Sequence, residues 1–256
     1  MIVKERSMKK VIKTLIIIIL LLIVIAGAAY LIYNHKVQED TKDIYEQLQE
    51  QVEDDLEEEP EEKKVRIPID FKKLKKANAD IYAWIKVKGT RINYPIVQHP
   101  TDDNYYLYYT IDGIKGYPGS IYTQSCNEKD FTDFNTVIYG HNMKNGSMFH
   151  DLHLFEDEEF FEKHDKVTIY TETERKRYKI FAAVVYSDRH LIHGFNYDNA
   201  KGRKKFLQSL KDSHSMSNHY REDVVVDENS HIITMSTCIG SRPNNRYLVL
   251  AVEIDD

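Results

Sequence analysis

The longest apolar stretch of the chain runs from Leu15 to Tyr33 and contains no charged residue. A helix needs about 20 such residues to cross a bilayer, so the pattern predicts a membrane-spanning signal anchor over 15–33. Basic residues gather before it, and positive charge favours the cytoplasmic side: Lys4, Arg6, Lys9, Lys10 and Lys13. We therefore expect a cytoplasmic segment over 1–14 and an extracellular remainder. A cleaved signal peptide is the alternative, but the apolar run continues past the small residues Ala26 to Ala28.

The next segment, 34–69, is strongly acidic and carries an apolar residue at every fourth position: Ile44, Leu48, Val52 and Leu56. This spacing places the four side chains along one side of a helix, which Pro60 should end. We predict an acidic helical stalk or linker. Two interpretations stay open, namely a charged spacer that holds the next domain off the membrane and a helix whose apolar side meets a partner.

Beyond Asp80 the pattern changes to short β-branched and aromatic runs bounded by turn residues. We predict eight strands, at 82–87, 91–97, 120–124, 136–139, 167–171, 178–187, 231–237 and 247–254. Helical spacing predicts helices at 71–79, with Asp70 as a possible N-cap, and at 147–155, 157–164 and about 197–211. The expected fold is mostly β with helices, an α+β domain whose eight strands favour a closed barrel.

Composition narrows the possible functions. The 18 Tyr and 10 Phe against 10 Gly and 6 Pro fit a strand-rich domain better than a disordered chain. The net charge is −6 and the basic clusters lie on predicted helices, so we expect no nucleic-acid partner. No CxxC or HExxH spacing occurs, so no metal or other cofactor is expected. Cys126 and Cys238 lie in unlike contexts, which argues against a disulfide framework.

Three polar residues stand at predicted strand ends. Cys238 ends the strand that starts at His231 and leads into a turn-rich loop, while His141 follows the strand at 136–139. Arg246 opens the last strand, and a hairpin could fold it back beside the thiol. A cysteine ending an apolar strand is more often a small core residue than a nucleophile, and a histidine in a loop is most often a solvated polar residue. Taken singly, none of the three indicates an activity.

Taken together, they resemble the sortase family. Tyr139-Gly-His141-Asn-Met, then Thr234-Met-Ser-Thr-Cys238 and then Arg246 match that family in order and placement, and the likeness spans roughly 78–256. It is greatest to class B, through Ile92-Asn-Tyr-Pro-Ile-Val-Gln98 and the helical insertion before the cysteine strand. The resemblance implies an eight-stranded sortase-type β-barrel with N-terminal helices, and an extracellular catalytic domain over 70–256. Met235 stands where the family usually has Leu, a residue of similar volume.

The resemblance implies a cysteine transpeptidase with Cys238 as nucleophile, His141 as acid and base, and Arg246 steadying the substrate backbone and the oxyanion. Arg242 is the rival arginine, but it lies in the loop before Pro243. The implied substrate groove has the loop 186–196 and three further residues: Asn93, Ile96 and Ser236. Two other interpretations stay open, namely that Asn93 is a turn residue and that Ile96 is a core residue.

The implied partners are secreted proteins with a C-terminal sorting signal of the Asn-Pro-x-Thr kind, cut after Thr. The implied acceptor is an amine of peptidoglycan or of a lipid-linked precursor, at the membrane of a Gram-positive bacterium. Cys126 matches no catalytic position and is expected to be a bystander thiol. The alternatives are a stalked surface binding module without activity and a pilus-type or other class of sortase with a different signal. A papain-like hydrolase is disfavoured because it places Cys before His.

Overall fold

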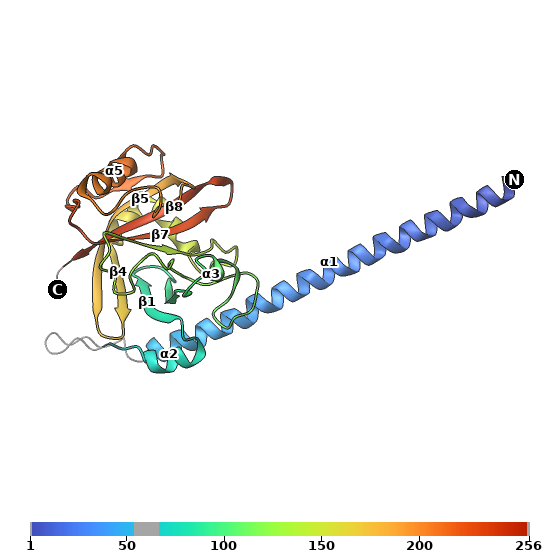
Figure 1. Cartoon of the computed structure of the whole chain (residues 1–256), viewed down its shortest axis with the longest axis horizontal. Coiled ribbons are helices and arrows are strands. Elements are labelled where there is room, and N and C mark those ends of the chain that lie inside the picture. The colour runs from blue at the N-terminus through green and yellow to red at the C-terminus, as the bar shows by residue number, and fades with distance from the viewer. Residues whose placement is uncertain (1, 54–66, 255–256) are drawn as a thin grey trace.

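The computed structural model describes residues 2–53 and 67–254, and shows a long N-terminal helix that leads into a β-rich domain (Figure 1). The described helices are α1 (Ile2–Glu53), α2 (Phe71–Ala77), α3 (Tyr105–Tyr108), the 3-10 helix η1 (His150–Glu156), α4 (Glu158–Lys163) and α5 (Ala200–Lys211). The described strands are β1 (Ile81–Val87), β2 (Asn93–Val97), β3 (Asn135–Tyr139), β4 (Lys166–Thr171), β5 (Arg175–Ser187), β6 (His219–Tyr220), β7 (Ile232–Ile239) and β8 (Arg242–Ile254).

One curled sheet holds all these strands in the order β2-β1-β4-β5-β8-β7-β3, with β6 added beside β5. Its pairs are antiparallel except for β3 with β7, which is parallel. Residues 121–123 join the two ends of this order, because Tyr122 bridges to Val97 of β2 and to Tyr139 of β3. Backbone hydrogen bonds of 2.8–3.1 Å hold both bridges. The sheet therefore closes into a barrel, which confirms the expected fold class.

One predicted strand needs correction, and α3 and β6 have no counterpart among the predicted elements. The run at 120–124 forms isolated bridges rather than a regular strand, since it passes between two edge strands and pairs with each at only one residue. The short strand β6 was not predicted, because two residues carry no periodicity. The predicted helix at 71–79 is confirmed as α2, and its N-cap is Asp70, whose carboxylate accepts from the Lys73 N–H at 3.0 Å.

The strands divide their apolar side chains between two cores. In β8, alternate residues face the barrel interior (Tyr247, Val249 and Ala251) or a second cluster beneath α5 (Leu248, Leu250 and Val252). This alternation is the period of two that a β-strand imposes. Phe206 and Leu210 of α5 complete the second cluster. Met235 is fully buried in the barrel core, where a Leu-sized side chain is expected.

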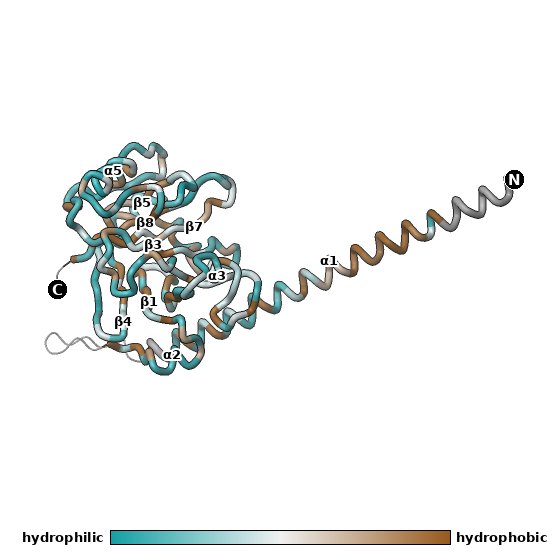
Figure 2. Tube along the Cα trace, viewed as in Figure 1, coloured by the Kyte–Doolittle hydropathy of each residue, from teal (hydrophilic) through white to brown (hydrophobic). Residues whose placement is uncertain are grey.

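Helix α1 has two unlike parts. Its apolar part, brown in Figure 2, projects away from the domain, and by length and composition α1 is the one described helix able to cross a membrane. From Val37 onward one side of the helix is buried against the domain: Val37, Thr41, Tyr45 and Leu48. Tyr45 meets the ring of Tyr94 edge-on at 5.2 Å, and Gln49 Nε2 donates to the Asn93 carbonyl at 2.7 Å.

The acidic segment is thus helical as expected as far as Glu53, but its apolar side packs on its own domain. The buried side differs from the predicted one, since Ile44 is only partly buried and Tyr45 takes the central place. The predicted positions Leu56 and Pro60 lie outside the described residues.

Candidate active site

The hairpin of β7 and β8 brings Cys238 and Arg246 together as a directly opposed antiparallel pair. The Cβ atoms of such pairs lie about 4.5–5.5 Å apart. Immediately after this pair the register shifts, and Ile239 pairs with Arg242, so that 243–245 form a bulge on β8. Bulges of this kind redirect side chains at sheet ends. Arg246 therefore stands beside the thiol, whereas Arg242 lies beyond the bulge.

His141 reaches the same place through the parallel pair of β3 and β7. The last paired residues are Tyr139 and Ser236, after which Gly140 N–H donates to the Ser236 carbonyl at 3.1 Å. Thr237 Oγ1 then donates to the Gly140 carbonyl at 2.8 Å, so the two chains continue side by side. Extending this register sets His141 next to Cys238. Strand alternation points Ser236 and Cys238 to one face of the sheet, the face that β8 shares at Arg246.

The imidazole of His141 is also contacted by residues outside the β-sheet. His141 Nε2 lies 2.8 Å from the Leu107 carbonyl, and because a carbonyl only accepts, the proton of this contact is on Nε2. The ring of Tyr117 lies 5.0 Å away. Leu107 of α3 and Tyr117 in the loop after it therefore set the orientation of the imidazole.

A groove of about 220 Å³ exposes these groups to solvent. The residues that line it include His141, Ser236, Cys238 and Arg246, together with Leu107, Tyr122, Gln124, Tyr139 and 188–191. The loop after β5 thus forms one wall, within the range 186–196 expected from the sequence. The three predicted catalytic residues and the predicted groove residue Ser236 therefore line the same groove.

Asn93 and Ile96 are not brought to this groove. Asn93 Oδ1 accepts from Trp84 Nε1 at 2.7 Å, and Ile96 is fully buried in the barrel core. Both lie on β2, and neither is among the residues that line the groove. Their expected role in substrate binding stays a prediction, and the core position of Ile96 is the one found. Cys126 is an exposed free thiol that does not line the groove.

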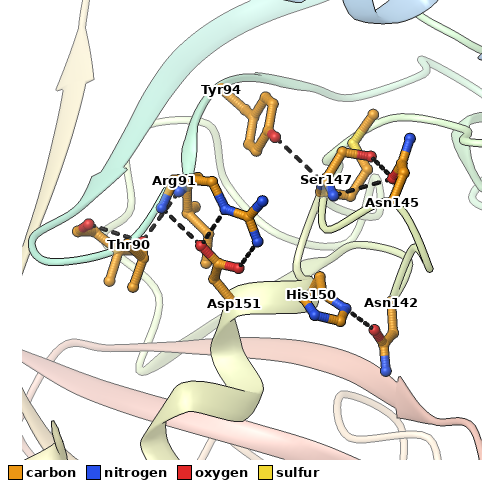
Figure 3. A network of polar contacts seen from close by, with 11 residues as sticks. Thr90, Arg91, Tyr94, Asn142, Asn145, Ser147, His150 and Asp151 are labelled. Atoms are coloured by element: carbon orange, nitrogen blue, oxygen red, sulfur yellow. Dashed lines mark hydrogen bonds and ion pairs between the residues drawn. The ribbon is translucent and has the colours of Figure 1, made fainter. Parts of the chain in front are cut away.

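Two side chains that sequence reasoning did not single out hold the backbone of Cys238. Asn142 Nδ2 donates to the Cys238 carbonyl at 3.1 Å, and His153 Nε2 contacts the same oxygen at 3.0 Å. Asn142 is itself oriented by His150, whose Nδ1 lies 2.8 Å from Asn142 Oδ1 (Figure 3). His153 is fixed by Glu156 Oε1 at 2.5 Å and by stacking on Tyr247. Such contacts between a side chain and a distant carbonyl leave no spacing signal in a sequence.

An ion pair between the exposed Arg91 and the buried Asp151 lies next to this network. Arg91 Nε and Nη2 donate to Asp151 at 2.9 and 2.5 Å, and the Arg91 backbone N–H adds a third bond at 2.9 Å (Figure 3). Burial alone would raise the pKa of Asp151, but the hydrogen bonds and charge of Arg91 outweigh it and hold that pKa below its ordinary value. The first turn of η1, next to His150, is thereby fastened to the β1–β2 turn.

The groove wall carries a second group of titratable side chains. Burial lowers the pKa of His190, and the adjacent His193, stacked at 4.4 Å, lowers it further while Asp103 opposes the change. Burial likewise raises the pKa of Tyr122, whose ring stacks on Tyr139 at 5.3 Å. Within the described ranges no group of His, Cys, Asp and Glu is arranged to hold a metal ion.

The curled barrel brings a cysteine, a histidine and an arginine together at the ends of three neighbouring strands, which is the arrangement of a class of cysteine enzymes. The family model for the sortase domain matches residues 85–254, so the chain belongs to the sortase family, whose members are cysteine transpeptidases. Its relatives place it in class B. It is 32% identical to sortase B of Listeria monocytogenes over 66% of this chain and 67% of that protein.

Solved structures agree with this class. Clostridium perfringens sortase B superposes with a TM-score of 0.65 at 33% identity, covering 73% of this chain and all of that one. Sortase B from B. anthracis gives a TM-score of 0.69 at 30% identity, over 86% of this chain and 98% of that one. The recognition of a class B sortase from its sequence motifs is confirmed.

Proposed function

We propose that this protein is a membrane-anchored class B sortase in which Cys238, His141 and Arg246 cut a sorting signal and transfer the cut protein to a cell-wall amine. The observation that carries the assignment of residues is the shared groove: Cys238 pairs with Arg246, and His141 follows the strand beside Cys238. The apolar helix α1 supports anchoring through residues 15–33, with the N-terminus in the cytoplasm and the domain outside.

In the first half-reaction, His141 takes the proton of the Cys238 thiol, and Sγ attacks the carbonyl carbon of Thr in an Asn-Pro-x-Thr-like signal. The C–S bond forms, the peptide C–N bond breaks, and His141 gives its proton to the leaving amine. The guanidinium of Arg246, the cross-strand partner of Cys238, places a positive charge beside the attacking sulfur. Its described hydrogen bonds, to the Pro243 and Asn245 carbonyls at 2.9 Å, use Nη1 alone.

In the second half-reaction, an amine from peptidoglycan or a lipid-linked precursor attacks the thioester. The C–S bond breaks as the new amide forms, and His141 takes the proton of the incoming amine. In both steps the guanidinium of Arg246, with its remaining N–H donors, stabilises the oxyanion of the tetrahedral intermediate. Two successive displacements through one covalent intermediate predict ping-pong kinetics.

The test is product analysis by mass spectrometry with the full chain in nanodiscs. A panel of Asn-Pro-x-Thr-x and Leu-Pro-x-Thr-Gly peptides is supplied with glycine oligomers, diaminopimelate-type amines or a lysine-bearing pilin-like peptide. We expect cleavage after Thr in an Asn-Pro-x-Thr peptide and a cross-linked product with a cell-wall amine. Transfer to the lysine peptide alone would instead indicate polymer assembly. If neither wild type nor Cys126→Ser cleaves any peptide of the panel, the proposal is overturned.

A further inference from the structure

Helix α1 joins the apolar run to the domain without interruption. It is one helix from Ile2 to Glu53, and packing against the domain begins at Val37, which is 5% exposed. At 1.5 Å per residue, Val37 stands about 6 Å beyond Tyr33 along the helix axis. Tyr30 and Tyr33 are exposed, and tyrosines at the end of a span mark the level of the membrane interface. Because each headgroup layer is about 5–7 Å thick, Val37 lies within or at the edge of that layer.

The part of the domain that touches α1 at this level is the segment 105–119, here called the tyrosine loop. Val37 Cγ1 lies only 3.7 Å from where a Cβ on Gly116 would be. Gly116 N–H donates to the Tyr108 carbonyl at 2.8 Å. This bond brings the backbone of Tyr108 close to that of Tyr117, which follows Gly116 in the chain. Figure 1 shows α3, the start of this loop, on the side of the domain where α1 leaves it.

The tyrosine loop presents two large aromatic side chains to solvent. Tyr108 is 56% exposed and Tyr117 is 58% exposed, and the exposed Lys115 lies between them in the chain. Most other tyrosines of the domain are buried or half-buried. A phenol with an apolar ring and a polar tip suits the headgroup region of a bilayer, and a lysine beside it suits lipid phosphate.

The same loop also holds the histidine of the active site. The carbonyl of Leu107 contacts His141 Nε2, and the ring of Tyr117 lies 5.0 Å from the imidazole. A Cβ on Gly119 would come within 3.2 Å of His141 Cδ2. Whatever positions the tyrosine loop relative to the membrane therefore positions the histidine side of the groove.

We propose that the tyrosine loop rests on the outer surface of the membrane, with Tyr108 and Tyr117 among the lipid headgroups, so that the groove opens at the bilayer surface beside His141. The inference rests on the proposed anchoring through residues 15–33 and goes beyond it, since an anchor alone leaves the orientation of the domain free. The partner is the lipid surface itself.

Fluorescence quenching in vesicles tests this contact directly. The full chain contains one tryptophan, Trp84, which is fully buried, so an added tryptophan reports its own surroundings. Tyr108→Trp and Tyr117→Trp are placed in phosphatidylcholine and phosphatidylglycerol vesicles with and without lipid brominated near the headgroup. The control is Val225→Trp, because Val225 is 85% exposed and lines a hollow with Ile254 near the C-terminus, on the side away from the N-terminus of α1 (Figure 1).

We expect brominated lipid to reduce the fluorescence of both loop variants, with a blue shift, and to leave the control unchanged. If brominated lipid quenches the loop variants no more than the control, while the protein stays in the membrane after alkaline carbonate extraction, the inference is overturned and the anchoring is left intact. Release of the protein by carbonate would overturn both. As a functional readout, Tyr108→Ser should slow cleavage of a lipid-tethered signal peptide several-fold while cleavage of the free peptide is unchanged, and equal rates on both substrates would contradict the proposal.

Discussion

Removing the Asn142 side chain tests whether the bonds to the Cys238 carbonyl serve the chemistry. Asn142→Ala deletes the 3.1 Å bond to that carbonyl and leaves His150 without its 2.8 Å partner. His153 still contacts the same oxygen at 3.0 Å, so a single variant weakens the clamp and a double variant with His153→Ala removes it. The expected loss is therefore larger in the double variant than the sum of the two single losses.

The magnitude follows from one neutral hydrogen bond at a solvent-exposed site. Such a bond contributes about 0.5–1.5 kcal/mol, and Cys238 is exposed, so water can partly replace the lost donor. If the full amount positions Sγ in the transition state, kcat/KM falls about 2- to 10-fold for each single variant. The double variant should fall by more than the product of the two single losses, because neither Asn142 nor His153 then fixes the carbonyl.

The assay measures kcat and KM for peptide cleavage, together with the thermal unfolding midpoint. A positioning role lowers kcat with little change in KM, whereas a purely structural role lowers the unfolding midpoint and leaves kcat of the folded fraction unchanged. The matched control is Asn145→Ala, since the hydrogen bonds described for Asn145 stay within its own turn, to Ser147 (Figure 3). If the double variant keeps kcat within about twofold of Asn145→Ala, the reasoning is refuted.

Three further predictions concern stability and the second thiol. Arg91→Ala leaves the Asp151 carboxylate buried, and we expect calorimetry to show a loss of about 1–3 kcal/mol, moderated by the exposure of Arg91. The pKa of Asp151 is lower in the folded than in the unfolded protein, so its stabilising effect is complete above the unfolded pKa of about 3.9 and is lost as the pH falls through the folded value. Below about pH 5, the unfolding midpoint of Arg91→Ala should therefore depend less on pH than that of wild type. Gly119→Ala requires φ near +64° and sets a Cβ 2.9 Å from two carbonyl oxygens, so it should lower both the unfolding midpoint by several degrees and kcat; an unchanged midpoint would contradict this. Cys126→Ser should keep wild-type kcat/KM, and a large loss would show that Cys126 is no bystander.

The local parts of the fold were accessible from the sequence because their signals are local. The strands β1 to β5, β7 and β8 are recognisable as β-branched and aromatic runs between turn residues, and α2 by its Asp70 cap. The closing segment 120–124 has the composition of a strand, but its pairing with both sheet edges depends on the curl of the whole barrel. In the same way, the spacing of Ile44 and Leu48 indicated a helix without showing that its apolar side is covered by the helix's own domain.

The chemical residues of the site were accessible because the family pattern fixes their order and because each stands at a strand end. The rest depends on contacts between distant parts of the chain. His153 of η1 contacts the Cys238 carbonyl at the end of β7, although 85 residues separate the two in the chain. Leu107 of the tyrosine loop contacts His141 across 34 residues. Asn93 was suggested for the groove by its motif position alone, and the structure adds that its side chain accepts a hydrogen bond from Trp84.

The most direct test of the central claim is the intact mass of the full chain in nanodiscs, mixed with an Asn-Pro-x-Thr signal peptide in the absence of acceptor amine. The account predicts an added mass equal to that of the peptide up to Thr less one water, mapped to Cys238 by proteolysis, in wild type and Cys126→Ser and absent from Cys238→Ala. An acyl adduct on any other residue, or an adduct that survives Cys238→Ala, would contradict the assignment of Cys238 as the nucleophile.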